Sequence, residues 1–245
     1  MSLSDRIFKG NPADRQNPLD IALINAIVTD SIDQAMQAIS SGANPNSFDR
    51  NGLPAILLSA SRQQVKIVEA LIKSGADINK KGTDKKQKIF NSSALIAASA
   101  NGNINIAKAL SDANANKNIT DDTGLTPLMS AAYMGNDNIV ALLIQNGASI
   151  EQKDEKGYTA LMFASNAGKI NSVKVLLENN ANVNAKDIDN STPIMFASQH
   201  GFNDVVRLLL FHGADRNFKG NYGLNAIDFA KQNSLNETIE ILEKN

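Results

Sequence analysis

The chain has 245 residues and a formal net charge of -1, and 42% of its residues are hydrophobic. A chain of this size can bury a sizeable core, and its charge balance gives no support for binding nucleic acid or an anionic membrane. It contains no cysteine, which excludes disulfides, thiolate metal ligands and a cysteine nucleophile.

Residues 1–16 are expected to cover the N-terminal end of the fold, and Met1–Leu3 are compatible with a cloning remnant. This stretch lacks the apolar region of a signal peptide, and no apolar run in the chain reaches the roughly 18–20 residues that span a bilayer. A soluble, cytoplasmic protein is therefore expected, with a secreted or periplasmic one left open if a signal has been trimmed.

From residue 17 onward the chain repeats with a period of 33 residues. The segment TPLMSAAYMGN at 126–136 returns as TALMFASNAGK at 159–169 and as TPIMFASQHGF at 192–202. The same register extends in both directions, with six extra residues in the third unit, which identifies an internal repeat. It predicts one domain, 17–245, of about seven units: 17–48, 49–81, 82–120, 121–153, 154–186, 187–219 and 220–245.

Each unit is expected to contain two short helices and a turn. In the fourth unit, Thr126 suits a helix N-cap, and Gly135 is expected to end that helix with a positive φ. A second, apolar helix follows over 139–144, and Asp154 and Gly157 then supply turn residues. A single unit cannot bury its apolar stripe, so the units are expected to stack.

This pattern resembles the ankyrin repeat, whose units read G-x-T-P-L-H-x-A-A, then a glycine, then V-V-x-L-L and G-A-D-V-N. The fourth unit carries it most fully, from Gly124 through Thr126-Pro127-Leu128 to Gly147. The resemblance covers about residues 17–245. It implies an all-α solenoid of helix–turn–helix units joined by β-hairpin fingers, in which the fingers and the first helices line a concave groove.

Two columns depart from the family pattern or add to it. The histidine after T-P-L is replaced by apolar residues, and a column of phenylalanines follows one position later. We interpret both columns as buried core rather than as a cofactor site. The residues are Ile96, Met129, Met162 and Met195, and Phe163, Phe196 and Phe229. In the terminal units Gln34, Gln37 and Glu243 replace apolar residues, as expected of polar ends that keep an array soluble.

The sequence contains no constellation for catalysis, so the protein is predicted not to be an enzyme and to need no cofactor. No phosphate-binding loop, nucleophile elbow or zinc-protease motif is present. The two histidines, His200 and His212, lie in the sixth unit. A metal pair with Asp187 or Asp189 is conceivable, but no third ligand is fixed by spacing, so a small-molecule or metal site there is kept only as an alternative.

The lengthened finger at 80–93, KKGTDKKQKIFNSS, is the one irregularity in the array. It is either a solvated loop or a basic finger that reaches an acidic partner surface or phosphates. Phe90 favours a contact, because an exposed aromatic ring beside lysines is more often a binding residue.

The resemblance places partner contacts at the fingertips and at the groove end of each first helix. All three tyrosines of the chain fall at such positions, and tyrosine is favoured at interfaces. The predicted partner-binding residues are Phe90, Asp122, Thr123, Tyr133, Met134, Lys156, Tyr158, Asp189, Gln199, His200 and Tyr222.

The predicted function is non-catalytic: a rigid concave surface that binds a protein, with little ordering entropy lost on binding. The chain is expected to be a monomer and to bind neither nucleic acid nor membrane. A bacterial scaffold secreted as a host-directed effector is the alternative role for the same surface.

Overall fold

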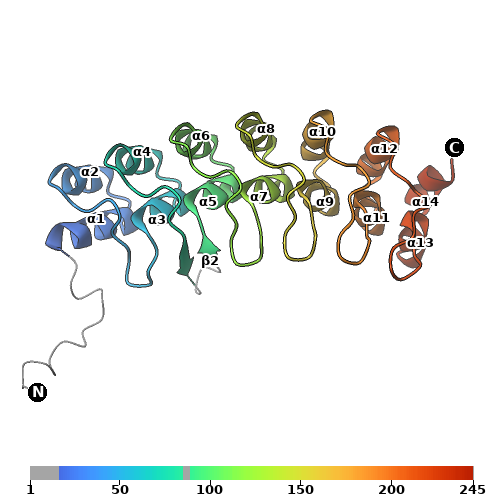
Figure 1. Ribbon diagram of the computed structural model, residues 1–245, viewed down its shortest axis with the longest axis horizontal. Coiled ribbons are helices and arrows are strands. Elements are labelled where there is room, and N and C mark those ends of the chain that lie inside the picture. The colour runs from blue at the N-terminus through green and yellow to red at the C-terminus, as the bar shows by residue number, and fades with distance from the viewer. Residues whose placement is uncertain (1–16, 85–88, 245) are drawn as a thin grey trace, which may run out of the picture.

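The computed structural model describes residues 17–84 and 89–244, and of residues 84, 89 and 90 it describes the backbone alone. Within these residues the chain forms an all-α solenoid of stacked helix pairs (Figure 1). The helices are α1 (Pro18–Val28), α2 (Ile32–Ser40), α3 (Ala55–Ser61), α4 (Val65–Lys73), α5 (Ala94–Asn101), α6 (Ile104–Asp112), α7 (Pro127–Met134), α8 (Asp137–Gln145), α9 (Ala160–Asn166), α10 (Ile170–Glu178), α11 (Pro193–Gln199), α12 (Asn203–Phe211), α13 (Ala226–Gln232) and α14 (Asn236–Glu243).

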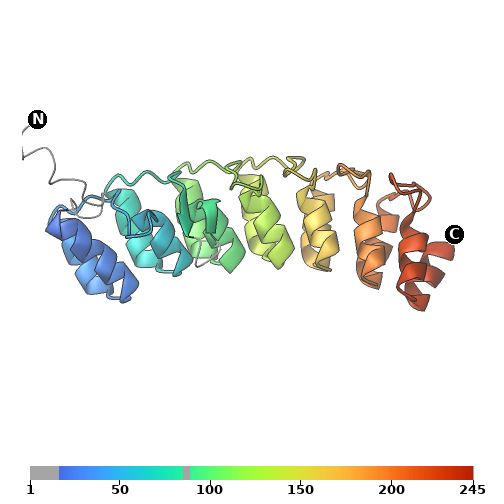
Figure 2. The ribbon, with the colours of Figure 1, turned by 90° about the horizontal axis from the view of Figure 1, so that it is seen from below.

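The helices form two layers. The odd-numbered helices make an inner row that packs along its length, and the even-numbered helices make an outer row behind it. The connecting fingers project beyond the inner row, on the side away from the outer helices (Figure 1). Seen from the finger side, the helix pairs stand next to one another and the row bends gently (Figure 2). The inner helices and the fingers are therefore neighbours along the whole array.

The inner helices begin and end as their sequence predicts. The Thr126 hydroxyl accepts a hydrogen bond from the backbone N–H of Met129 at 3.2 Å, and Thr159 does the same for Met162 at 3.4 Å. Gly135 ends α7 in the left-handed conformation, with φ of 79°. These two predictions are confirmed, because the cap satisfies a free N–H and glycine accepts a positive φ without strain.

The core runs without interruption between the two layers. Ala131 and Ala132 of α7 are fully buried, which lets neighbouring inner helices approach closely. Ile139, Val140 and Leu143 of α8 are buried against them. The methionine column is buried as predicted, since Met129, Met162 and Met195 are each at most 2% exposed.

A side-chain bond ties each of the first five units to the next at the same place. The Asn46 carboxamide oxygen accepts from the backbone N–H of Asp77, 31 residues onward, at 2.7 Å. Asn118, Glu151 and Asn184 make the equivalent bond 31 residues onward at 2.8 Å. Asn79 reaches Asn116 across the lengthened finger, 37 residues onward, also at 2.8 Å. The tie therefore recurs with an unchanged length.

The fingers differ from the expected β-hairpins. Among the described residues, paired strands occur only in the lengthened third finger, where β1 (Gly82–Asp84) runs antiparallel to β2 (Ile89–Ser92). The fingers of the fourth to sixth units close with two backbone bonds each. In the fifth unit the N–H of Asp154 donates to the carbonyl of Tyr158 at 3.1 Å, and the N–H of Gly157 donates to the carbonyl of Asp154 at 3.0 Å. These fingers are five-residue turns, and among the described residues regular strands are confined to the lengthened finger.

Candidate protein-binding surface

One aspartate shapes each of the middle fingers. The Asp154 carboxylate accepts from the backbone N–H of Lys156 at 2.9 Å and of Tyr158 at 2.7 Å. Asp121 and Asp187 make the same pair of bonds in the neighbouring fingers. Each carboxylate thereby satisfies two N–H groups of its own turn. The turn role predicted for Asp154 is confirmed.

The fingers are also bonded to one another. The N–H of Glu155 donates to the carbonyl of Thr123 at 3.1 Å, and the N–H of Ile188 donates to the carbonyl of Lys156 at 3.2 Å. A Cβ on Gly124 would lie 2.9 Å from the backbone of Asp154, so the fingers approach too closely there for any side chain. The fingertips at 121–125, 154–158 and 187–191 thus form one continuous ribbon, which we call the finger ribbon.

Four aromatic rings run from the inner helices onto this ribbon. The ring of Tyr133 on α7 meets Phe163 on α9 edge to face, with centroids 6.2 Å apart. Tyr158 on the finger lies 5.7 Å from Phe163 and 5.1 Å from Phe196 on α11, both edge to face. Edge-to-face contacts at these distances stabilise the rings in fixed orientations. We call the four residues the aromatic ladder.

The ladder is open to solvent at one end. Tyr133 is 46% exposed and Met134 beside it is 50% exposed, whereas Tyr158, Phe163 and Phe196 are half-buried. Ile188 on the ribbon is 66% exposed. Apolar side chains of this size on a rigid frame are suited to contact a partner.

Two titratable groups at the ribbon have raised pKa values. Burial raises the pKa of the Tyr158 hydroxyl above 10.0, and the negative charges of Asp187, Asp154 and Asp189 raise it further. Burial also raises the pKa of Asp187, an effect opposed by the backbone N–H groups of Ser191 and Asp189. Burial is the main cause of both shifts, and the neighbouring carboxylates add to them.

The other predicted finger residues lie on the same ribbon. Asp122 accepts from the Asn91 carboxamide at 2.8 Å, and the Thr123 hydroxyl donates to Asp121 at 2.8 Å. Lys156 is exposed, and Asp189 accepts through its carbonyl from the N–H of Asn221 at 2.9 Å.

The predicted residues at the C-terminal end of the array lie apart from the ladder. Gln199 and His200 are exposed at the end of α11, where a ring nitrogen of His200 lies 3.1 Å from the Asn166 carboxamide oxygen. Tyr222 is 74% exposed, and none of the ring contacts among the described residues includes it. The structure therefore brings Tyr133, Met134 and Tyr158 together and leaves Tyr222 separate.

The two histidines are not brought together. His200 follows α11 and His212 follows α12, so the nine residues of α12 separate them by about 14 Å along the helix axis. The His212 ring packs against Phe211 instead, with centroids 5.4 Å apart. In the described part of the chain no three His, Cys, Asp or Glu side chains are grouped to hold a metal ion.

Part of the lysine-rich finger falls outside the described residues, as does the side chain of Phe90, so its predicted contact stays a prediction. At the base of that finger the Lys81 ammonium donates to the carbonyl of Thr120 at 2.8 Å. This lysine therefore ties the base of the lengthened finger to the residue that precedes the next fingertip, 121–125.

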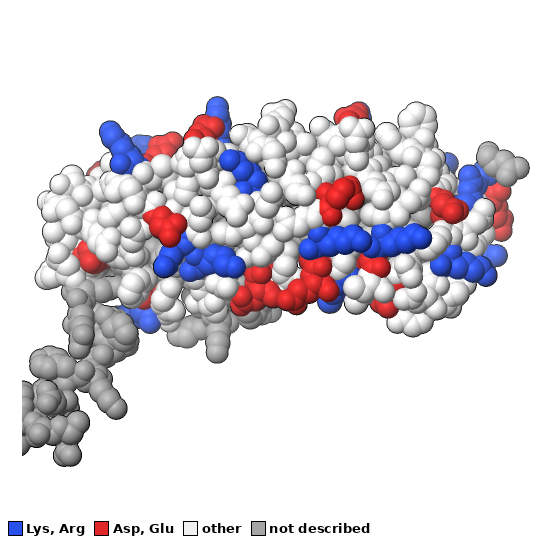
Figure 3. All heavy atoms as spheres, viewed as in Figure 1, with Lys and Arg blue, Asp and Glu red and all other residues white. Residues whose placement is uncertain are grey.

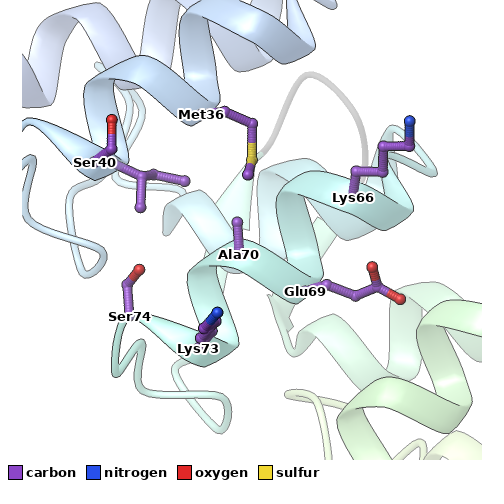
Figure 4. Close-up of a pocket in the computed structure, with 8 residues that line it drawn as sticks. Met36, Ser40, Lys66, Glu69, Ala70, Lys73 and Ser74 are labelled. Carbon is purple, nitrogen blue, oxygen red and sulfur yellow. The ribbon is translucent and has the colours of Figure 1, made fainter.

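A separate hollow lies in the outer layer, between α2 and α4 (Figure 4). Met36, Ile39 and Ala70 line its apolar part, and Lys66 and Glu69 carry charges beside it. It lies in the layer remote from the fingers (Figure 1), so it is not part of the aromatic ladder.

Phe163 and Phe196 belong to the candidate surface through their ring contacts, whereas sequence reasoning assigned them to the core. The spacing of residues along the inner helix could have indicated their position. Phe163 precedes the groove position Asn166 by three residues, which places both on one helical face. The phenylalanines are only half-buried because that face turns toward the fingers.

Comparison with known protein families supports one assignment. Family models match three segments: an ankyrin repeat at residues 51–83, ankyrin repeats (3 copies) at 95–187 and ankyrin repeats (many copies) at 180–230. A search of curated proteins found no match. No helix among the described residues is long and apolar enough to cross a membrane. Ankyrin repeats are generally protein–protein interaction modules and typically non-catalytic scaffolds. The stacked helix pairs, the capped inner helices and the matching family models show that this chain belongs to the ankyrin repeat family.

Proposed function

We propose that this chain binds a protein partner through the aromatic ladder and the finger ribbon. The observation that carries the proposal is the ring contact between Tyr133 and Phe163, continued through Tyr158 to Phe196. It joins three units and a finger into one apolar surface whose exposed end is Tyr133 and Met134.

The surface is suited to binding because it is held in place before any partner arrives. Backbone bonds between fingers fix the ribbon, and edge-to-face contacts fix the rings. Little conformational freedom is then lost on association, which favours affinity. Large aromatic side chains in such a setting contribute most of the binding energy in many interfaces.

Affinity capture with paired baits tests the proposal. The wild-type chain is compared with a Tyr133→Ala/Met134→Ala variant, using lysate from the source cell and from candidate host cells. Phe211→Ala is the matched control, because Phe211 is 84% exposed at the end of an outer helix. A protein retained by wild type and by the control, but lost from the ladder variant, supports the proposal.

The proposal fails if retained proteins are the same on all three baits, or if they depend on Phe211 and not on Tyr133. Circular dichroism melting of each bait establishes that the substitutions leave the fold intact. Because Tyr133 and Met134 are about half exposed, their truncation should change the free energy of unfolding by less than about 1 kcal/mol.

A further inference from the structure

The finger ribbon carries unbalanced negative charge. Its three fingertips, 121–125, 154–158 and 187–191, contain six acidic residues and one basic residue, although the whole chain is nearly neutral. The acidic residues are Asp121, Asp122, Asp154, Glu155, Asp187 and Asp189, and the basic residue is Lys156. In Figure 3, acidic side chains lie along the tips of the middle fingers, and a row of basic ones lies just above them.

The acidic charge is not neutralised by ion pairs. Among the described residues the ion pairs join Lys174 to Glu178, Arg207 to Glu237 and Lys244 to Glu240, all remote from the fingertips.

The two lysines that precede the fifth and sixth fingertips direct their ammonium groups elsewhere. The Lys153 ammonium donates to the carbonyl of Lys186 at 2.8 Å, and the Lys186 ammonium lies 3.8 Å from the centroid of the Phe218 ring. Among the described residues the fingertip carboxylates therefore have no cation of their own, and those of Asp122 and Glu155 are the most exposed to solvent.

Aromatic rings stand beside these carboxylates. Tyr158 is on the ribbon itself and contacts Phe163 and Phe196, and Tyr133 completes the ladder at its exposed end. Ring faces attract cations, and a guanidinium stacks on them more readily than an ammonium does. The chain already makes this kind of contact internally, between Lys186 and Phe218.

We propose that the partner segment is basic, and that one of its arginine side chains lies on the aromatic ladder while neighbouring cations face Asp122, Glu155 and Asp189. This inference rests on the proposed function and names the chemistry of the partner. Acidic groups around an aromatic contact steer a cationic segment toward it and repel an acidic one. An uncharged or acidic segment would leave the six carboxylates without complementary charge.

Fluorescence anisotropy with defined peptides tests the inference without knowledge of the partner. The probe is a fluorescein-labelled peptide of Arg-Ser-Gly repeats, compared with the same peptide carrying Gln or Glu in place of Arg. At about 50 mM NaCl the Arg peptide is expected to bind at least about tenfold more tightly than the Gln peptide. Binding should weaken at about 300 mM NaCl, because exposed charges are then screened.

Two triple variants separate local charge from net charge. Asp122→Asn, Glu155→Gln and Asp189→Asn together remove three of the six negative charges of the ribbon. Glu69→Gln, Glu178→Gln and Glu240→Gln remove three negative charges from exposed positions on outer helices. The ribbon variant should lose about tenfold in affinity for the Arg peptide, and the outer-helix control should lose less than about twofold. Tyr133→Leu should lose about threefold and Tyr222→Leu should lose nothing measurable.

Equal affinity for the Arg and Gln peptides overturns the inference. So does an equal effect of the two triple variants, or an unchanged affinity in Tyr133→Leu. These outcomes are distinguishable from failure of the proposed function. Suppose that a captured partner depends on Tyr133 and Met134 but binds the ribbon triple variant as tightly as wild type. The proposed function then stands, and the inference of a basic partner segment is wrong.

Discussion

In several units the residue that opens the outer helix reaches back toward the preceding unit, and its chemistry changes along the array. In the second and fourth units it is an amide. The Gln64 side chain donates to the carbonyl of Ile27 at 2.8 Å, and the Asn136 side chain donates to the carbonyls of Ser99 at 2.7 Å and Ala100 at 3.2 Å. These bonds satisfy carbonyls at the ends of inner helices, which have no partner within the helix.

In the fifth to seventh units the same position makes an apolar contact. The Lys169 stem, the Phe202 ring and the Leu235 side chain cover Gly135, Gly168 and Gly201 respectively, so closely that a Cβ on each glycine would lie 2.8–3.1 Å from the covering side chain. The position that opens the outer helix therefore accepts either a hydrogen bond or a packed contact to the preceding unit. The comparison shows that stacking depends on the shape of the junction, and that its chemistry is free to vary.

The largest expected loss of stability comes from a substitution that disrupts the packed form of the junction. Gly168→Ala places a methyl group against the Phe202 ring at a position with φ of 65°, so both sterics and backbone strain oppose it. We expect a loss of about 2–4 kcal/mol in the free energy of unfolding, measured by urea denaturation.

Gly147→Ala is the matched control for that substitution. Its φ of 84° is similar, but no atom lies within 4 Å of an added Cβ. It should cost about 1–2 kcal/mol from the backbone alone. Equal losses at the two glycines would show that the Phe202 contact does not constrain the junction.

Removing the covering ring should have a smaller effect. Phe202→Ala is expected to cost about 2 kcal/mol, less than a fully buried phenylalanine, because the ring is only half-buried. In this background Gly168→Ala should cost no more than Gly147→Ala does, since the opposing ring is gone. A double-mutant cycle by urea denaturation measures this coupling, and strict additivity would contradict the packed-junction account.

Disrupting the hydrogen-bonded form of the junction is expected to cost less stability than disrupting the packed form. Asn136→Ala removes both bonds to the end of α5 and should cost about 1–2 kcal/mol by thermal and urea unfolding. Asn138→Ala, on the exposed side of α8, is the control and should change stability by less than about 0.5 kcal/mol. Indistinguishable losses would mean that the Asn136 bonds add nothing to stacking.

The smallest expected effect on stability concerns the fingers, where the buried group is the carboxylate of Asp187. Burial raises the pKa of Asp187, so the folded chain holds that proton more tightly than the unfolded chain does. Ionisation of this group therefore destabilises the fold. Stability is lost as pH rises from the ordinary carboxylate pKa through the raised one, and the loss is complete above both.

Asp187→Asn tests this pH dependence. The carboxamide oxygen keeps an acceptor for the N–H groups of Asp189 and Ser191 and removes the charge. The melting temperature of the variant relative to wild type is expected to be slightly higher at pH 7 than at pH 4. The reverse order would show that the ionised carboxylate is the favoured partner of the turn.

Local rules predicted much of this molecule from its sequence. Thr126 as a cap, Gly135 as a left-handed stop and Asp154 as a turn residue each depend on a few neighbouring atoms, and each was found as expected. The family frame also placed Tyr133 and Tyr158 at the inner surface, where their rings are joined by Phe163.

What could not be predicted depends on geometry between units. The back-reaching role of Asn136 and Phe202 requires the offset of one helix pair against the next, which a single unit does not encode. The joining role of Phe163 was missed for the same reason, since its partners come from a neighbouring helix and a finger.

The tie from Asn79 to Asn116 has a consequence for how such arrays diversify. It spans 37 residues where its counterparts span 31, yet its length is the same 2.8 Å. Extra residues in a finger therefore leave the spacing of the scaffold untouched. A finger between two such ties can accept foreign sequence, such as a recognition loop or a reporter peptide, while the units on either side keep their relative positions.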